Sequence, residues 1–78
     1  MKEVKVLGPG CAKCKKLADN VKEALESTQT DANFEYITDI QKIMEHGIMM
    51  TPGLIIDGKI ESTGKVLSVK DIVQLINS

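Results

Sequence analysis

The chain has 78 residues, of which 42% are hydrophobic and 27% are charged, and its formal net charge is −1. These values are ordinary for one small globular domain and argue against disorder, and the near-neutral charge argues against a nucleic-acid binder, which usually carries a basic surplus. No apolar run approaches the roughly 20 residues that span a bilayer, and the first residues lack the apolar stretch of a signal peptide. We therefore expect a cytoplasmic protein without membrane insertion.

The first half of the chain predicts a strand, a helix and a second strand. Residues 4–7 form an apolar run that the Gly8-Pro9-Gly10 segment ends. From residue 11 to about residue 27, apolar residues recur at helical spacing. They are Cys14, Leu17, Ala18, Val21, Ala24 and Leu25. Residues 33–37 read as the second strand, and a β-α-β unit of this kind should be parallel.

A short helix is predicted next. Thr38 followed by Gln41 fits a capping box at its start, and Gly47 is a suitable residue to end it. Its inward positions are predicted to be Ile40, Ile43 and Met44. We assign Met44, Met49 and Met50 to the core and to the rim of an active site.

The end of the chain predicts a hairpin and a last helix. Residues 53–56 are continuously apolar, which suits a central strand covered on both faces. Asp57-Gly58 is a strong signal for a two-residue hairpin loop, so residues 59–62 form the returning edge strand. Ser68, with Asp71 three residues later, caps the last helix. The predicted fold class is α/β, in the order β-α-β-α-β-β-α, with a four-stranded mixed sheet flanked by three helices in a single domain over residues 1–78.

Only two cysteines are present, Cys11 and Cys14, and they are three residues apart. In a reducing cytosol such a pair is seldom a structural staple, and the loop that it closes is too short to stabilise the fold much. On the first turn of a helix, their Cα atoms can come within the roughly 4.4–6.8 Å that a disulfide needs. Chemistry therefore explains the pair better than stability does.

The two cysteines are predicted to have different roles. Cys11 sits at the helix N-terminus, where unpaired N–H groups favour a thiolate, so we expect it to be the exposed nucleophile. Cys14 lies on the apolar stripe and should be the buried resolving thiol. Gly8 and Gly10 should leave the approach to the pair free of side chains. Positive charge nearby comes from Lys13, Lys15 and Lys16.

A metal-binding carrier or sensor is the alternative function, because such proteins also place C-x-x-C at a strand-to-helix junction. They follow the order β-α-β-β-α-β, whereas this sequence predicts a helix between its second and third strands. Zinc would also need four ligands, and one pair supplies two. An inert interaction module is the third hypothesis, which a disulfide that neither forms nor exchanges would support.

The arrangement resembles the thioredoxin-like superfamily, in which C-x-x-C ends the first strand and opens a helix. Nearly the whole chain shares the resemblance. It is most similar to the small glutaredoxin-like redox-active disulfide proteins of archaea and bacteria, through Gly8-Pro9-Gly10-Cys11-Ala12-Lys13-Cys14 and Pro52-Gly53-Leu54. The minimal thioredoxin/glutaredoxin-like fold is therefore the expected fold.

The resemblance implies a thiol–disulfide oxidoreductase that exchanges its dithiol with protein disulfides and is reduced by an upstream disulfide reductase. It implies a cis bond before Pro52, with the Thr51 backbone aimed at the cysteines to bind substrate as an added short strand. We place Gly10 and Lys13 in the same substrate-binding surface. We expect a monomer without cofactor or bound metal.

Overall fold

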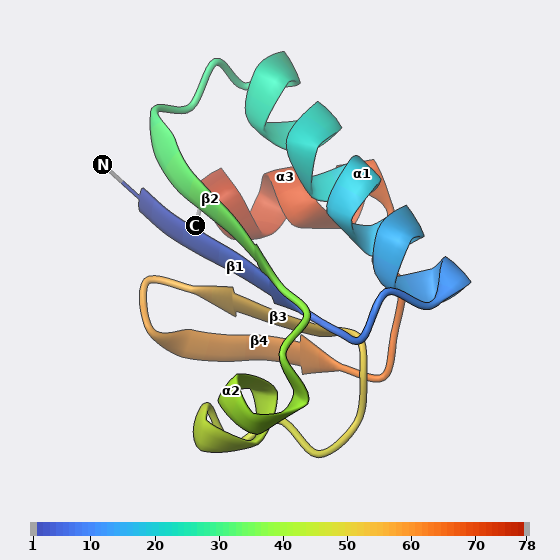
Figure 1. The fold of residues 1–78 in the computed structure, drawn as a ribbon. Coiled ribbons are helices and arrows are strands. Elements are labelled where there is room, and N and C mark those ends of the chain that lie inside the picture. Colours follow the sequence, from blue (N-terminus) through green and yellow to red (C-terminus); the bar gives the residue numbers. More distant parts are fainter. Residues whose placement is uncertain (1, 78) are drawn as a thin grey trace.

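The computed structural model describes residues 2–77 and has the predicted order of elements (Figure 1). The elements are β1 (Lys2–Leu7), α1 (Ala12–Ser27), β2 (Ala32–Ile37), α2 (Ile40–Glu45), β3 (Gly53–Ile56), β4 (Lys59–Thr63) and α3 (Val69–Asn77). The fold is α/β and thioredoxin-like, as predicted. None of the helices within the described residues is long and apolar enough to cross a membrane.

The four strands form one mixed sheet in the order β2-β1-β3-β4. β1 is parallel to β2, whereas β3 is antiparallel to both β1 and β4. The register pairs Leu7 at the end of β1 with Gly53 at the start of β3. Gly8 and Pro52, the next residues outward, therefore lie side by side at one end of the sheet. This register brings the loop before α1 next to the loop before β3.

Two apolar clusters lie on opposite faces of the sheet. Val4 and Val6 of β1 belong to the larger cluster with residues of α1 and α3, which lie together on one face (Figure 1). Leu7 of β1 points to the opposite face, because side chains alternate along a strand. The smaller cluster there consists of Leu7, Ile37, Ile43, Ile48 and Ile55. All four residues of β3 are buried, which confirms a central strand covered on both faces.

Helix α1 buries the stripe that its spacing predicts. Its fully or almost fully buried side chains are Cys14, Leu17, Ala18, Val21 and Ala24. Asn20 on the same helix donates a hydrogen bond to the Leu67 carbonyl oxygen (2.9 Å), just before α3. The predicted cap of α3 is confirmed, since Ser68 Oγ accepts from the Asp71 N–H at 3.2 Å. Helix α1 is thus fixed to the sheet and to α3, and this packing sets the position of its first turn.

The prediction for α2 was wrong in two respects. Asp39, not Thr38, is its N-cap, and the Asp39 carboxylate accepts from the Gln41 N–H at 2.9 Å. A carboxylate one residue nearer the helix can meet this N–H and also complements the positive end of the helix dipole. Only Ile43 is buried in α2, whereas Ile40 and Met44 are 62% and 69% exposed. The helix packs on the sheet through Ile43, which belongs to the smaller cluster, and its other apolar side chains face solvent.

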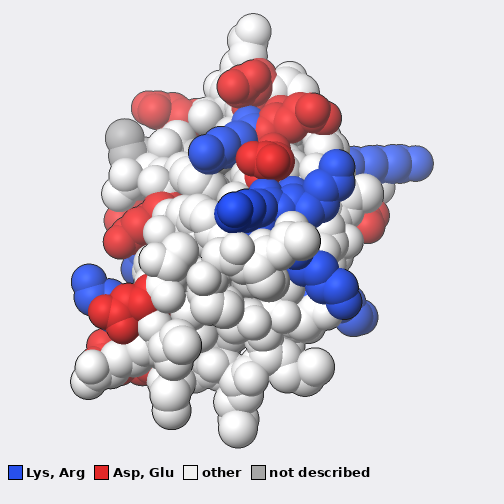
Figure 2. Space-filling view, turned by 45° about the vertical axis from the view of Figure 1, so that its right-hand side comes forward, with Lys and Arg blue, Asp and Glu red and all other residues white. Residues whose placement is uncertain are grey.

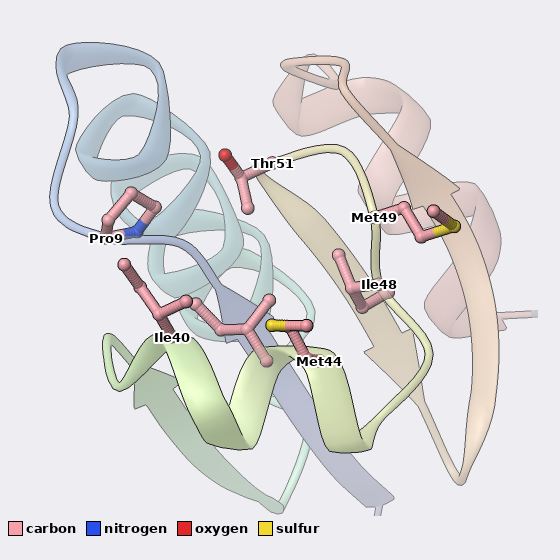
Figure 3. Close-up of a pocket in the computed structure, with 7 residues that line it drawn as sticks. Pro9, Ile40, Met44, Ile48, Met49 and Thr51 are labelled. Carbon is pink, nitrogen blue, oxygen red and sulfur yellow. The ribbon is translucent and has the colours of Figure 1, made fainter.

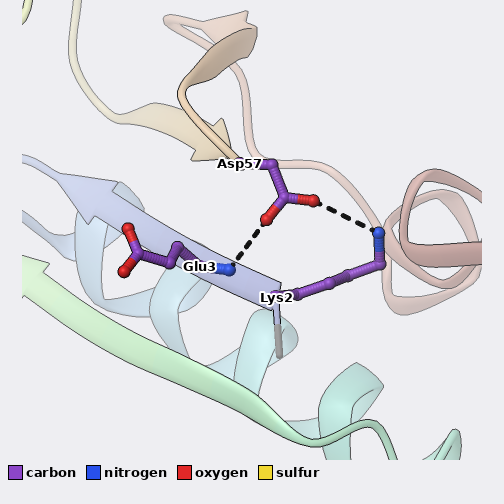
Figure 4. Close-up of polar contacts among 3 residues, drawn as sticks. All are labelled: Lys2, Glu3 and Asp57. Carbon is purple, nitrogen blue, oxygen red and sulfur yellow. Dashed lines mark hydrogen bonds and ion pairs between the residues drawn. The ribbon is translucent and has the colours of Figure 1, made fainter.

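The hairpin between β3 and β4 turns at Asp57 and Gly58, as predicted. Both have positive φ, 53° and 83°, which is the backbone that a two-residue hairpin loop requires. The Asp57 carboxylate also accepts the Glu3 backbone N–H at 2.9 Å and lies 3.4 Å from Lys2 Nζ (Figure 4). These contacts, the Glu3 hydrogen bond first, lower the pKa of Asp57 below its ordinary value of 3.8. The hairpin is thereby anchored to the start of β1.

Candidate active site

The two cysteines occupy the junction between β1 and α1. Cys11 is the N-cap residue of α1, with extended backbone (φ −68°, ψ 168°), and its Sγ accepts the Cys14 N–H at 3.2 Å. The Cys11 side chain is exposed, whereas Cys14 is 0% exposed. The two sulfurs form a disulfide, with the Cα atoms 5.0 Å apart. One sulfur therefore faces solvent at a helix N-terminus, and the other faces the core.

Gly8 provides the space that the Cys14 sulfur fills. A Cβ atom at position 8 would collide with Cys14 Sγ and would lie 2.9 Å from Cys14 Cβ. The same position is 3.8 Å from Pro52 Cα. Gly8 is buried, and its N–H donates to the Ile37 carbonyl oxygen at 2.9 Å, so its backbone is fixed. The absence of a side chain at Gly8 thus lets Cys14 pack directly against the end of β1, next to the loop of Pro52.

Pro52 is buried beside the cysteine loop, and its peptide bond with Thr51 is cis. Its carbonyl oxygen accepts the Gly64 N–H at 2.9 Å, which holds the loop before β3 to the end of β4. Thr51 itself is half-buried, and among residues 2–77 no hydrogen-bond partner occupies its backbone. A free backbone segment therefore lies next to the disulfide.

Gly10 and Lys13 flank Cys11 along the chain. Gly10 has a φ of +98°, a left-handed backbone that glycine adopts without the steric cost of a Cβ, and the space around it is open. Lys13 is exposed on the first turn of α1. The loop can therefore turn sharply into the helix while leaving the outer side of Cys11 uncovered.

An apolar groove of about 430 Å³ adjoins this site. It is lined by Pro9, Ile40, Ile43, Met44, Ile48, Met49 and Thr51. Pro9 from the cysteine loop and Thr51 from the loop before β3 face each other at one end of it, and α2 forms its floor (Figure 3). The groove thus runs from the loops that precede Cys11 and Pro52 over α2.

Charged side chains avoid the groove. Figure 2 shows a broad uncharged surface over the lower part of the molecule, where α2 and the loop before β3 lie in Figure 1. Lysines and acidic residues gather above and beside it (Figure 2). Exposed Ile40, Met44 and Met49 contribute to the uncharged surface. Apolar residues exposed together next to a reactive group indicate a binding surface.

The groove and the role of Gly8 are the parts of the site that the sequence did not reveal. Ile40 and Met44 have the spacing of inward residues, and their exposure depends on how little of α2 the sheet covers. Met49 was assigned to the core or the rim, and at 95% exposure it belongs to the rim. The expectation that Gly8 leaves the approach to the cysteines open was wrong, because Gly8 is buried and lies against Cys14.

The geometry also bears on the metal-carrier alternative. Helix α2 lies between β2 and β3, which is not the element order of those carriers. Among the described residues, no group of three or more histidine, cysteine or acidic side chains is arranged to hold a metal ion. The site as described offers two sulfurs joined to each other.

Comparison with known proteins agrees with this fold and site. The family model described as "Thioredoxin domain" matches residues 2–77. The chain is 35% identical to a thioredoxin of Methanothermobacter thermautotrophicus over 77 residues, covering 99% of this chain and all of that protein. It is 36% identical to a thioredoxin of Methanocaldococcus jannaschii over 75 residues, covering 96% of this chain and 86% of the relative. With a C-x-x-C disulfide at the start of α1, the chain belongs to the thioredoxin-domain family and is a thiol–disulfide oxidoreductase.

Proposed function

We propose that Cys11 is the attacking thiol and Cys14 the resolving thiol in exchange with protein disulfides. The observation that carries this assignment is the contrast in burial, because an external disulfide can reach exposed Cys11 but not Cys14. The Cys14 N–H that donates to Cys11 Sγ, together with the start of the helix, stabilises a negative sulfur at position 11.

The exchange has two steps. The Cys11 thiolate attacks one sulfur of the client disulfide, the client S–S bond breaks, and the second client sulfur leaves as a thiolate that takes up a proton. Cys14 then loses its proton and attacks Cys11 Sγ, which releases the first client sulfur as a thiol. Two electrons pass from the cysteine pair to the client. An upstream disulfide reductase returns the pair to its dithiol form.

We propose that the client docks along the loop before β3 and in the groove. The unpaired Thr51 backbone can bond an extended client segment, while buried Pro52 keeps that backbone beside the disulfide. Gly10 leaves room for the client chain over Cys11, and Lys13 adds positive charge near the departing thiolate. An apolar client side chain next to the exchanged cysteine fits the groove, because the groove begins at Pro9 and Thr51.

Trapping of mixed disulfides tests the two roles. With Cys14→Ser, the first step proceeds and the second cannot, so covalent complexes with disulfide proteins should accumulate. A reductant should separate these complexes into their two proteins. Cys11→Ser is the matched control and should trap few partners, since its remaining thiol is buried. Equal, low trapping by both variants would contradict the assignment. Mass spectrometry of the complexes identifies the clients. The reductase, the monomeric state and a cytoplasmic location stay predictions from the sequence.

A further inference from the structure

Three of the chain's four methionines fall within a stretch of seven residues that ends two residues before Pro52. Met44, Met49 and Met50 are 69%, 95% and 64% exposed. Met44 and Met49 line the groove, from α2 and from the loop before β3, and the Met49 side chain extends outward at its edge (Figure 3). Met50 does not line the groove; its Cε lies 3.1 Å from where a Cβ of Gly64 would be. All three methionines are therefore exposed, but only Met44 and Met49 line the groove.

We propose that Met44 and Met49 are oxidation sites whose sulfoxides lower client docking while the exchange chemistry continues. This inference rests on the proposed docking of clients in the groove. Thioether sulfurs that are open to solvent can reach a peroxide directly, whereas the Cys11–Cys14 disulfide has no free thiol to react. The methionines are therefore the oxidisable sulfurs of the disulfide form beside the site.

The reaction balances with hydrogen peroxide as the oxidant. The O–O bond breaks, one oxygen atom bonds to the methionine sulfur, and the other leaves as water. The sulfur loses two electrons, which the peroxide gains. The product replaces a flexible apolar side chain with a polar one.

The consequence follows from the composition of the groove. Its other lining residues are mainly aliphatic and offer few hydrogen bonds to a sulfoxide oxygen. An apolar client side chain bound there offers none. Burying that oxygen under a client costs free energy without compensation. A small disulfide that reaches Cys11 without filling the groove avoids this cost.

The experiment treats the disulfide form with hydrogen peroxide, removes it, and reduces only the cysteines with a phosphine. Peptide mass spectrometry then measures sulfoxide at each methionine. Rates of reduction are measured for insulin, as a protein disulfide, and for hydroxyethyl disulfide. We expect treatment to slow insulin reduction about tenfold and to leave the small disulfide within about twofold.

Two variants assign the effect. After peroxide treatment, Met44→Leu/Met49→Leu should reduce insulin at the rate of its own untreated sample. The Met50→Leu variant should instead be slowed by the treatment as much as the wild type is. Because all variants share Met1, oxidation there is common to them. Equal loss in the double variant, equal loss with both substrates, or no loss despite full oxidation of Met44 and Met49 overturns the proposal. Failure of untreated protein to reduce insulin would instead overturn the proposed function, and this inference with it.

Discussion

Gly8 lies directly against Cys14, and no side chain larger than hydrogen fits between the end of β1 and that sulfur. The Cys14 Cβ is held by a buried helical stripe, and the Gly8 N–H is bonded to Ile37. Neither partner can withdraw easily. The position of the Cys14 sulfur is thus set by the strand as well as by the helix.

The substitution Gly8→Ala is expected to destabilise the protein and to slow its second exchange step. The added methyl group overpacks a closed site, which costs about 1–3 kcal/mol in the free energy of unfolding. Displacement of Cys14 should also lengthen the lifetime of the mixed disulfide, which stopped-flow mixing with a labelled disulfide measures. Ile72→Val in the distant core is the control, since it removes about 0.5–1.5 kcal/mol without touching the cysteines. Equal lifetimes of the mixed disulfide in both variants would contradict a positioning role for Gly8.

The Cys11 thiol in the Cys14→Ser protein should have a pKa below the value of about 8.5 for a free cysteine. The helix N-terminus and the N–H at position 14 favour the thiolate. The rate of alkylation by iodoacetamide against pH gives this pKa. Lys13→Glu should raise it, whereas Lys59→Glu, beside the hairpin turn at the opposite end of the sheet, provides a charge-matched control away from the site. A pKa at the free-thiol value would remove the argument from the helix terminus.

Replacing Asp39 should weaken α2, and replacing Thr38 should not. The Asp39 carboxylate caps the helix, so Asp39→Ala is expected to lower the free energy of unfolding by about 1 kcal/mol. Thr38→Ala should change it by less than about 0.5 kcal/mol. Urea denaturation of both variants measures the difference. A larger loss from Thr38→Ala would favour the capping box that the sequence suggested.

The contacts of Asp57 make part of the stability depend on pH. Because the pKa of Asp57 is lowered on folding, its carboxylate stabilises the fold above its ordinary value of 3.8, and this is lost as pH falls through the lower, folded value. Urea denaturation of wild type and Asp57→Asn should differ most near neutral pH, and the difference should shrink below about pH 4. Asparagine can keep the turn and the Glu3 contact, so the comparison isolates the charge. A difference independent of pH would contradict it.

Local patterns were sufficient for most of the fold and for the cysteine pair. The helical spacing around Leu17, the apolar run of β3 and the Asp57-Gly58 turn each depend on neighbouring residues, and each prediction was confirmed. The outward position of Ile40 and Met44 was missed, because it depends on how far the sheet extends under α2. The Gly8–Cys14 contact likewise depends on strand register, which helical spacing does not encode.

Helix α2 is held to the fold by a single buried side chain, and most of its apolar surface is exposed. One inward residue, Ile43, is buried against the sheet and also lines the groove, whereas Ile40 and Met44 line the groove while they remain largely exposed. Mutations at the outward positions can therefore accumulate over evolution at low cost to folding. If clients dock in the groove as proposed, substitutions at these positions would change which clients bind while the disulfide and the core stay as they are.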